Sequence, residues 1–356
     1  MGETFRKNVI VVGAGASKEF GLPTGAELAQ SIASIADICF DDSGMRLSSG
    51  DHQIVSTLRF LVESNGTGNR DINPYLHAAW RIRDNMSLAP SIDNFLDTHR
   101  DDSLLVDFGK IAICHAIQMA ESSSRLRVDH RGSNPTINFQ AIKGSWLEQL
   151  FKLLVAQRNF EDFLTALSQI TFVSFNYDRC IHQFFYFACT SYFNLNPESQ
   201  QKLLAALRVL YPYGTIGQFT GIGLNTNFGQ VNYQGQLIEA SRLIRTFTEG
   251  AESSLVKEIR SEIESSEIVM FLGFGFLQLN MDLLFQNQRF RPIRVLGTGK
   301  GLSKDSISEV ELELADIFVH EAAGVVDIDD LERIRIVDCT CGELFFEFQR
   351  YLTRAR

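Results

Sequence analysis

The stretch NVIVVGAGAS at residues 8–17 decides the fold that the rest of the chain must follow. Its first five residues are mostly β-branched, and a short apolar run that stops at a glycine is typical of a buried parallel strand. From Ala26 to Ile35 the apolar residues then recur at helical spacing. Strand, glycine turn and helix in this order open an α/β nucleotide-binding fold. We therefore predict a Rossmann-like parallel sheet with helices on both faces.

The glycines after this strand predict a tight turn that brings backbone amides close to a phosphate group. The loop consists of Gly13, Ala14, Gly15, Ala16 and Ser17 and is followed by Gly21-Leu22-Pro23. Lys18 stands where the dinucleotide fingerprint GxGxxG has its third glycine, and the spacing does not fit a Walker A loop. A glycine turn that merely joins strand to helix is the alternative. From the loop alone we favour phosphate binding.

Strand and helix patterns alternate again from residue 170 onward. The predicted strands are 170–175, 209–211, 268–272, 293–296 and 334–337, and the predicted helices are 178–188, 237–249, 252–265, 280–285, 304–315 and 341–352. Residues 40–165 show helical patterns and no convincing buried strand. We therefore predict an α/β domain made of residues 1–39 and 166–356, into which residues 40–165 are inserted as a helical subdomain.

Composition restricts what the chain can bind. Its 356 residues are 45% hydrophobic and 21% charged, which is typical of a globular protein. The net charge of −10 argues against direct nucleic-acid binding, because affinity for phosphates comes from clustered Lys and Arg. No signal peptide and no membrane-spanning run is recognisable, so we expect a cytoplasmic protein without membrane contact. The six cysteines include no CxxC pair, and we expect no structural zinc.

Two further motifs follow predicted strands, at the edge where open α/β sheets bind ligands. In SFNYD at 174–178, Asn176 is of the type that fixes a ribose hydroxyl or a water, although from this motif alone we favour an Asx turn that caps the next helix. In LGFGF at 272–276, the glycines fit either a close approach to a ligand or a β-bulge. A third segment, SIDNFL at 91–96, predicts a capped helix start, to which we assign no function.

Taken in order, these motifs resemble the sirtuin-like domain that bacterial antiphage defence systems use as an NAD+-consuming effector. GAGAS with GLP is similar to that family's first nucleotide loop, SIDNFL to its PSIDxFL signature, and SFNYD to the motif that carries its catalytic Asn. YPYG at 211–214 lies where the family usually has a His-Gly pair. LGFGF with Asn280 resembles the second nucleotide loop, and GTGKGLS at 297–303 resembles the strand end after it. The resemblance covers about residues 8–305.

The resemblance implies a set of site residues. By this likeness Asn176 is the catalytic residue that orders the ribose and the attacking water, and Asp178 beside it caps or orients locally. Tyr213 stands in place of the family's catalytic His, and His182, six residues after Asn176, is an alternative catalytic group. The implied nucleotide contacts are Gly13, Ala14, Gly15, Ala16, Ser17, Pro23, Gly273, Gly275, Asn280 and Thr298.

The same resemblance implies an activity and partners. NAD+ is the implied substrate, cleaved by water to nicotinamide and ADP-ribose, because the zinc ribbon of deacetylating sirtuins is missing. The chain would act as a homo-oligomer that depletes NAD+ in antiphage defence, with a HerA-type ATPase as partner. Because of the Tyr213 departure, a non-catalytic module that binds NAD+ or ADP-ribose is the alternative, and a plain assembly subunit is a third. We expect Asn176→Ala to abolish NAD+ consumption while leaving folding and NAD+ binding largely intact.

Overall fold

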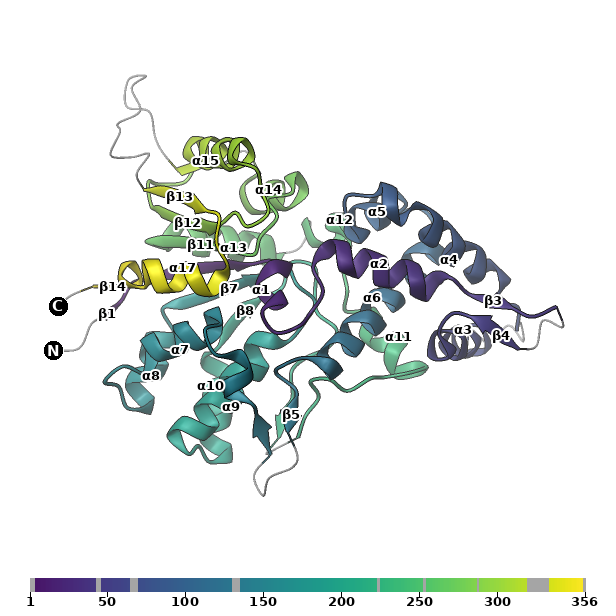
Figure 1. Cartoon of the computed structure of the whole chain (residues 1–356), viewed down its shortest axis with the longest axis horizontal. Coiled ribbons are helices and arrows are strands. Elements are labelled where there is room, and N and C mark those ends of the chain that lie inside the picture. Colours follow the sequence, from purple (N-terminus) through teal and green to yellow (C-terminus); the bar gives the residue numbers. More distant parts are fainter. Residues whose placement is uncertain are drawn as a thin grey trace.

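Six parallel strands form the central sheet, and helices cover both of its faces (Figure 1). The structure, a computed structural model, describes residues 4–42, 46–64, 70–129, 135–222, 225–251, 254–286, 288–318 and 333–354. The strands of the sheet in chain order are β2 (Asn8–Val12), β7 (Ile170–Ser174), β8 (Arg208–Leu210), β11 (Ile268–Leu272), β12 (Arg294–Thr298) and β13 (Ile334–Val337). The predicted α/β class with a Rossmann-like parallel sheet is confirmed.

The order of the strands across the sheet is β13-β12-β11-β2-β7-β8. Strand β2 therefore lies in the middle of the sheet. The next two strands of the chain, β7 and β8, lie on one side of it, and β11, β12 and β13 lie on the other, which is the arrangement of Rossmann folds. Val12 pairs with Leu272 on one side and with Ser174 on the other, so the ends of β2, β11 and β7 are in register. Ligands of such sheets bind beyond the carboxyl ends of the strands at this switch point.

Side chains along each central strand alternate between two hydrophobic cores. In β2, Val9 and Val11 face one core, while Ile10 and Val12 face the other. On the first core lie α13 (Ser254–Ser265), α14 (Gln278–Phe285) and α15 (Lys304–Phe318), and this core continues into the helices beside the sheet. Those on the second are α7 (Trp146–Val155), α8 (Phe160–Leu167), α9 (Cys180–Phe193), α10 (Pro197–Ala206) and α17 (Cys341–Phe348). Burial on both faces explains the continuous apolar runs of the strands.

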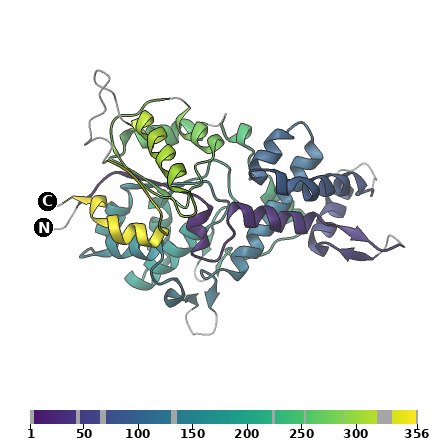
Figure 2. The ribbon, with the colours of Figure 1, turned by 45° about the horizontal axis from the view of Figure 1, so that its top comes forward.

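A group of helices packs beside the sheet (Figures 1 and 2). These helices, together called the helical subdomain, are α2 (Gly25–Ala36), α3 (His52–Ser64), α4 (Asn73–Asn85), α5 (Ile92–Thr98), α6 (Ser103–Ser123) and α11 (Gly235–Ser241). Its centre is α6, which contacts each of the other five. By length and composition α6 alone among the described helices would suit a membrane span, but 61% of its most apolar window is buried. We therefore interpret α6 as the core helix of the subdomain.

The contacts of three helices cross the predicted boundaries at residues 39 and 165. Although α2 was predicted for the α/β domain, it packs on α4 and α6. Although α7 and α8 lie inside the predicted insertion, they pack on the sheet, where Trp146 contacts Phe172 of β7. The described part of residues 40–165 adds no strand to the central sheet. It contains β4 (Leu47–Ser49), which pairs with β3 (Cys39–Phe40), and a second small hairpin of β5 (Val128–Asp129) and β6 (Thr136–Ile137).

The predicted strands coincide with those of the sheet to within two residues. One predicted helix is wrong in its extent, because residues 237–249 form two short helices, α11 and α12 (Phe247–Ala251). Between them the chain leaves the helix, and the Arg245 amide donates to the carbonyl of Tyr213 over 2.9 Å. This turn ties the end of the helical subdomain to the YPYG segment.

Candidate functional site

A cleft with a volume of about 550 Å³ opens at the carboxyl ends of β2, β7 and β11. Residues from the loops after these strands line it, together with residues at the start of α5, the end of β12 and the start of α17. Its volume is in the range of small-molecule sites. The predicted site residues that line it are Gly13, Ala14, Gly15, Asn176, Tyr213, Gly273, Gly275, Asn280 and Thr298. The cleft thus lies at the switch point of the sheet.

The two glycine loops touch each other directly. Gly13 donates its amide to Leu272 O over 2.9 Å, and Gly15 donates to Gly273 O over 3.0 Å. Gly273 has φ +56°, in the left-handed region, and a Cβ there would come within 2.0 Å of Ala16 N. Only glycine fits such a contact. The glycines are therefore required for packing of the loops, whatever the cleft binds.

This packing uses most of the amides that were expected to hold a diphosphate. The amides of Gly13 and Gly15 are bonded to the second loop, and Ala16 N donates to Gly13 O over 3.0 Å. The Ala14 amide, at the start of the short helix that follows, makes no hydrogen bond to another described residue. Lys300, exposed at the edge of the cleft, adds a positive charge. The capacity of the first loop for phosphate is thus smaller than the sequence predicts.

Asn176, two residues beyond β7, has its amide nitrogen fixed by two acceptors. Nδ2 donates to Gly13 O over 2.9 Å and to Ser17 Oγ over 2.9 Å. Because a backbone carbonyl can only accept, this contact determines which way the side-chain amide points. Oδ1 has no partner among the described residues, and the residue lines the cleft. Asn176 therefore keeps one acceptor oxygen for a ligand or a water.

Asp178 and Ser17 lie behind Asn176 and do not line the cleft. The Asp178 carboxylate accepts a hydrogen bond from Cys180 N over 3.0 Å at the start of α9, and the Ser17 hydroxyl nearby favours its ionised form. Burial raises the pKa of Asp178 despite both neighbours. Asp178 was grouped with the catalytic residues, but it does not line the cleft. It lies beside Ser17, whose Oγ accepts from Asn176 Nδ2.

Tyr213 connects two of the predicted motifs. Its hydroxyl donates to Asn280 Oδ1 over 2.7 Å, and its ring packs edge-on against Phe175 at 5.6 Å. Burial and the nearby carboxylates of Asp93 and Asp97 raise the pKa of Tyr213. The phenol therefore keeps its proton at neutral pH and acts as a hydrogen-bond donor, not as a base.

His182 does not belong to the cleft. Its ring stacks with the rings of Tyr211 and Phe219 at 6.2 and 5.7 Å, and its Nδ1 lies 3.3 Å from the Tyr211 hydroxyl. Burial lowers its pKa to about 4. The structure therefore does not bring His182, the alternative catalytic group, to the cleft, because the aromatic stack holds it elsewhere.

Asp93 is a site residue that the sequence analysis missed. It lies in the first turn of α5, lines the cleft and accepts a hydrogen bond from the Tyr177 hydroxyl. Burial raises the pKa of both groups. The predicted cap of this helix is present, because Ser91 Oγ accepts from Asn94 N over 3.1 Å. Capping explains Ser91 but not Asp93, which lines the cleft.

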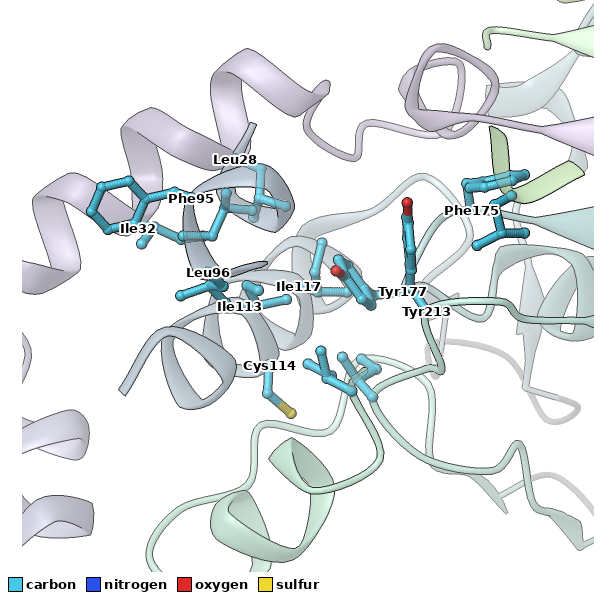
Figure 3. Close-up of a cluster of buried hydrophobic side chains, with 14 of the residues drawn as sticks. Leu28, Ile32, Phe95, Leu96, Ile113, Cys114, Ile117, Phe175, Tyr177 and Tyr213 are labelled. Carbon is cyan, nitrogen blue, oxygen red and sulfur yellow. The ribbon is translucent and has the colours of Figure 1, made fainter. Parts of the chain in front are cut away.

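The side chains around Asp93 join the helical subdomain to the sheet. In Figure 3, Tyr177 and Tyr213 lie between Phe175 on the sheet side and the side chains of Phe95 and Ile117 on the helical side. All five are buried. The site is therefore built between the two parts of the fold, not on the sheet alone.

Three predicted nucleotide contacts are placed where they have little to offer a ligand. Ala16 is fully buried, and Pro23 does not line the cleft. Thr298 lines it, but its hydroxyl accepts from Gly273 N over 2.8 Å and so holds the second glycine loop.

No protein-family model matches the chain. No curated protein matches it significantly either. The site is therefore interpreted from its own geometry.

Proposed function

We propose that the chain cleaves NAD+ into nicotinamide and ADP-ribose. The observation that supports this most is the position of Asn176, whose amide orientation is fixed and whose Oδ1 remains available in a cleft at the switch point of a Rossmann-like sheet. An acceptor held in this way can order a ribose hydroxyl or an attacking water.

The reaction asks little of acid catalysis, because nicotinamide leaves as a neutral molecule. The bond between ribose C1′ and the nicotinamide nitrogen breaks with its electron pair going to nicotinamide, and the ribose becomes oxocarbenium-like. Water then bonds to C1′ and loses a proton. In this proposal the Asp93 carboxylate takes that proton and passes it to solvent. The other carboxylate of the cleft wall, Glu19, already accepts from Trp146 N and Gly342 N.

The remainder of the cleft offers groups that suit the rest of the dinucleotide. Ala14 N and the Lys300 ammonium would meet the diphosphate, since a free amide and a cation both favour anionic oxygens. Asn280 keeps its Nδ2 after Oδ1 has accepted from Tyr213, which leaves a donor for a ribose or base acceptor. These contacts support NAD+ over a smaller ligand.

The test measures, by chromatography, the nicotinamide that the protein releases from NAD+. NADH is the matched control substrate, because its uncharged reduced ring is a poor leaving group. We expect nicotinamide from NAD+ with the wild type and about a hundredfold to a thousandfold slower release with Asn176→Ala. Absence of nicotinamide with the wild type, alone and together with the ATPase partner proposed below, would contradict the function.

A second function is favoured by one observation, the protonated Tyr213 in place of a base. In that case the chain binds NAD+ or ADP-ribose and reports it to a partner. Calorimetry distinguishes the two functions, because a binding module gives a stable NAD+ complex from which no nicotinamide appears.

On the resemblance alone we further propose a role in antiphage defence with a HerA-type ATPase. NAD+ turnover with and without the neighbouring gene product tests that partnership.

A further inference from the structure

A buried ion pair lies behind the loop that carries Asn176. Glu121, near the C-terminal end of α6, is fully buried and forms an ion pair with Arg179, whose side chain is 4% exposed. The Glu121 carboxylate accepts from Arg179 N over 2.9 Å, from Arg179 Nε over 3.2 Å and from Gly229 N over 3.1 Å, besides the Arg179 Nη2 contact. It therefore holds the backbone of residue 179 as well as its side chain.

This pair is connected to Asn176 by a short series of contacts. Residue 179 follows Asn176 by three residues in the loop between β7 and α9, and Ser17 Oγ, which accepts from Asn176 Nδ2, lies beside Asp178 of the same loop. A displacement of the backbone at 179 therefore shifts the group that fixes the Asn176 amide. Misplacing a reacting group by about 1 Å reduces turnover by roughly a hundredfold. The Glu121 carboxylate is thus well placed to influence the position of Asn176 without touching a ligand.

We propose that Glu121 is a positioning residue for Asn176, through which the helical subdomain controls turnover. This inference rests on the proposed function, since it takes Asn176 as the residue at the reacting atoms. Because α6 contacts the other helices of the subdomain, a partner that displaces them moves Glu121 and with it the Asn176 loop. The expected regulator is therefore a protein that binds the helical subdomain, away from the cleft.

The test compares Glu121→Gln with Glu262→Gln. Glu262 is also a buried carboxylate with cationic partners, Lys7 at 3.3 Å and Arg208 at 3.2 Å, and it accepts from Thr171 Oγ1 over 3.0 Å at the opposite end of β7. In Glu121→Gln we expect kcat for nicotinamide release to fall at least about tenfold while KM for NAD+ stays within about threefold. In Glu262→Gln we expect kcat within about twofold of the wild type, although it also melts at a lower temperature.

A second measurement separates this inference from the proposed function. We expect backbone amides of residues 174–180 to exchange hydrogen faster in Glu121→Gln and at the wild-type rate in Glu262→Gln. Equal exchange in all three proteins overturns the positioning role, whether or not the wild type releases nicotinamide. A wild type that releases no nicotinamide refutes only the proposed function. Unchanged kcat in a folded Glu121→Gln variant of an active enzyme overturns it as well. If Glu121→Gln does not fold, Glu121→Gln with Arg179→Gln, which leaves no unpaired charge, takes its place under the same criteria.

Discussion

Replacing Asn176 by Ala removes two contacts that hold the loops together and one acceptor that faces the cleft. The lost bonds are those from Nδ2 to Gly13 O and to Ser17 Oγ. Gly13 O keeps a partner, because it still accepts from Ala16 N over 3.0 Å, and the Ser17 hydroxyl keeps the Asp178 carboxylate as a neighbour. The variant should therefore fold, with a modest loss of stability.

The size of that loss follows from the bonds. Each hydrogen bond contributes about 0.5–1.5 kcal/mol net, so two of them reduce the free energy of unfolding by about 1–3 kcal/mol. For a chain of this length the melting temperature falls by roughly 1–4 °C. This revises the expectation from the sequence that folding is largely unaffected. Turnover should fall by about a hundredfold to a thousandfold, as when a group that stabilises developing charge is removed.

The assay measures nicotinamide release and thermal unfolding side by side, under activating conditions. Asn196→Ala is the matched control, because Asn196 caps α10 by accepting from Ser199 N over 2.9 Å and lies outside the cleft. It should lose about 0.5–2 kcal/mol of stability and keep its turnover. If Asn176→Ala turns over NAD+ within about tenfold of the wild type below its melting transition, Asn176 is only a structural residue and the catalytic assignment is refuted.

Three further substitutions test other parts of the site. Gly273→Ala should lose more than about 2 kcal/mol in chemical denaturation, since a Cβ would come within 2.0 Å of backbone, whereas Gly301→Ala, with φ +87° and open space around it, should lose only about 1 kcal/mol; equal losses would contradict the loop contact. His182 has its pKa lowered from about 6.5 to about 4, so the unfolded chain binds a proton there at a higher pH than the folded chain does. The free energy of unfolding therefore falls by about 3 kcal/mol through this group as the pH falls from 6.5 to 4. Urea unfolding at pH 7 and pH 4.5 should show a smaller fall for His182→Phe than for the wild type. The same fall in both proteins counts against the lowered pKa. Tyr213→Phe should lower kcat by about tenfold without changing the shape of the pH–rate profile between pH 6 and 9, and a profile that does change would make the phenol a base after all.

The strands of the sheet could be predicted because each is recognisable from its own residues. A strand buried on both faces is a continuous apolar run, and residues 268–272 were predicted to the residue as β11. The position of the cleft followed in the same way, because the carboxyl ends of parallel strands meet at one edge and the motifs stand at those ends. The order of the strands did not follow, since nothing within a strand specifies its neighbours.

Contacts between distant segments were beyond these patterns. Asp93 and Tyr177 are 84 residues apart, and only the fold reveals that the helix start at 91–96 forms a wall of the cleft. The bond between Gly15 N and Gly273 O likewise joins two motifs that were interpreted separately, and it removes a donor that the first motif seemed to offer. Sequence patterns identify groups able to bind a ligand, but the folded protein satisfies some of those groups itself.

This difference determines which features of the site argue for a ligand. The glycines at 13, 15 and 273 are explained by the contact between the loops, and the polar groups of Thr298 and Asp178 are occupied by neighbouring residues. None of them requires a nucleotide. Folding does not account for Asn176 Oδ1, the Ala14 amide or the Lys300 ammonium, all of which belong to residues that line one cleft. An acceptor for a hydroxyl, a donor for a phosphate oxygen and a cation form the set that a phosphorylated sugar needs. The proposed NAD+ binding therefore depends on these three groups more than on the glycine motif by which the fold was predicted.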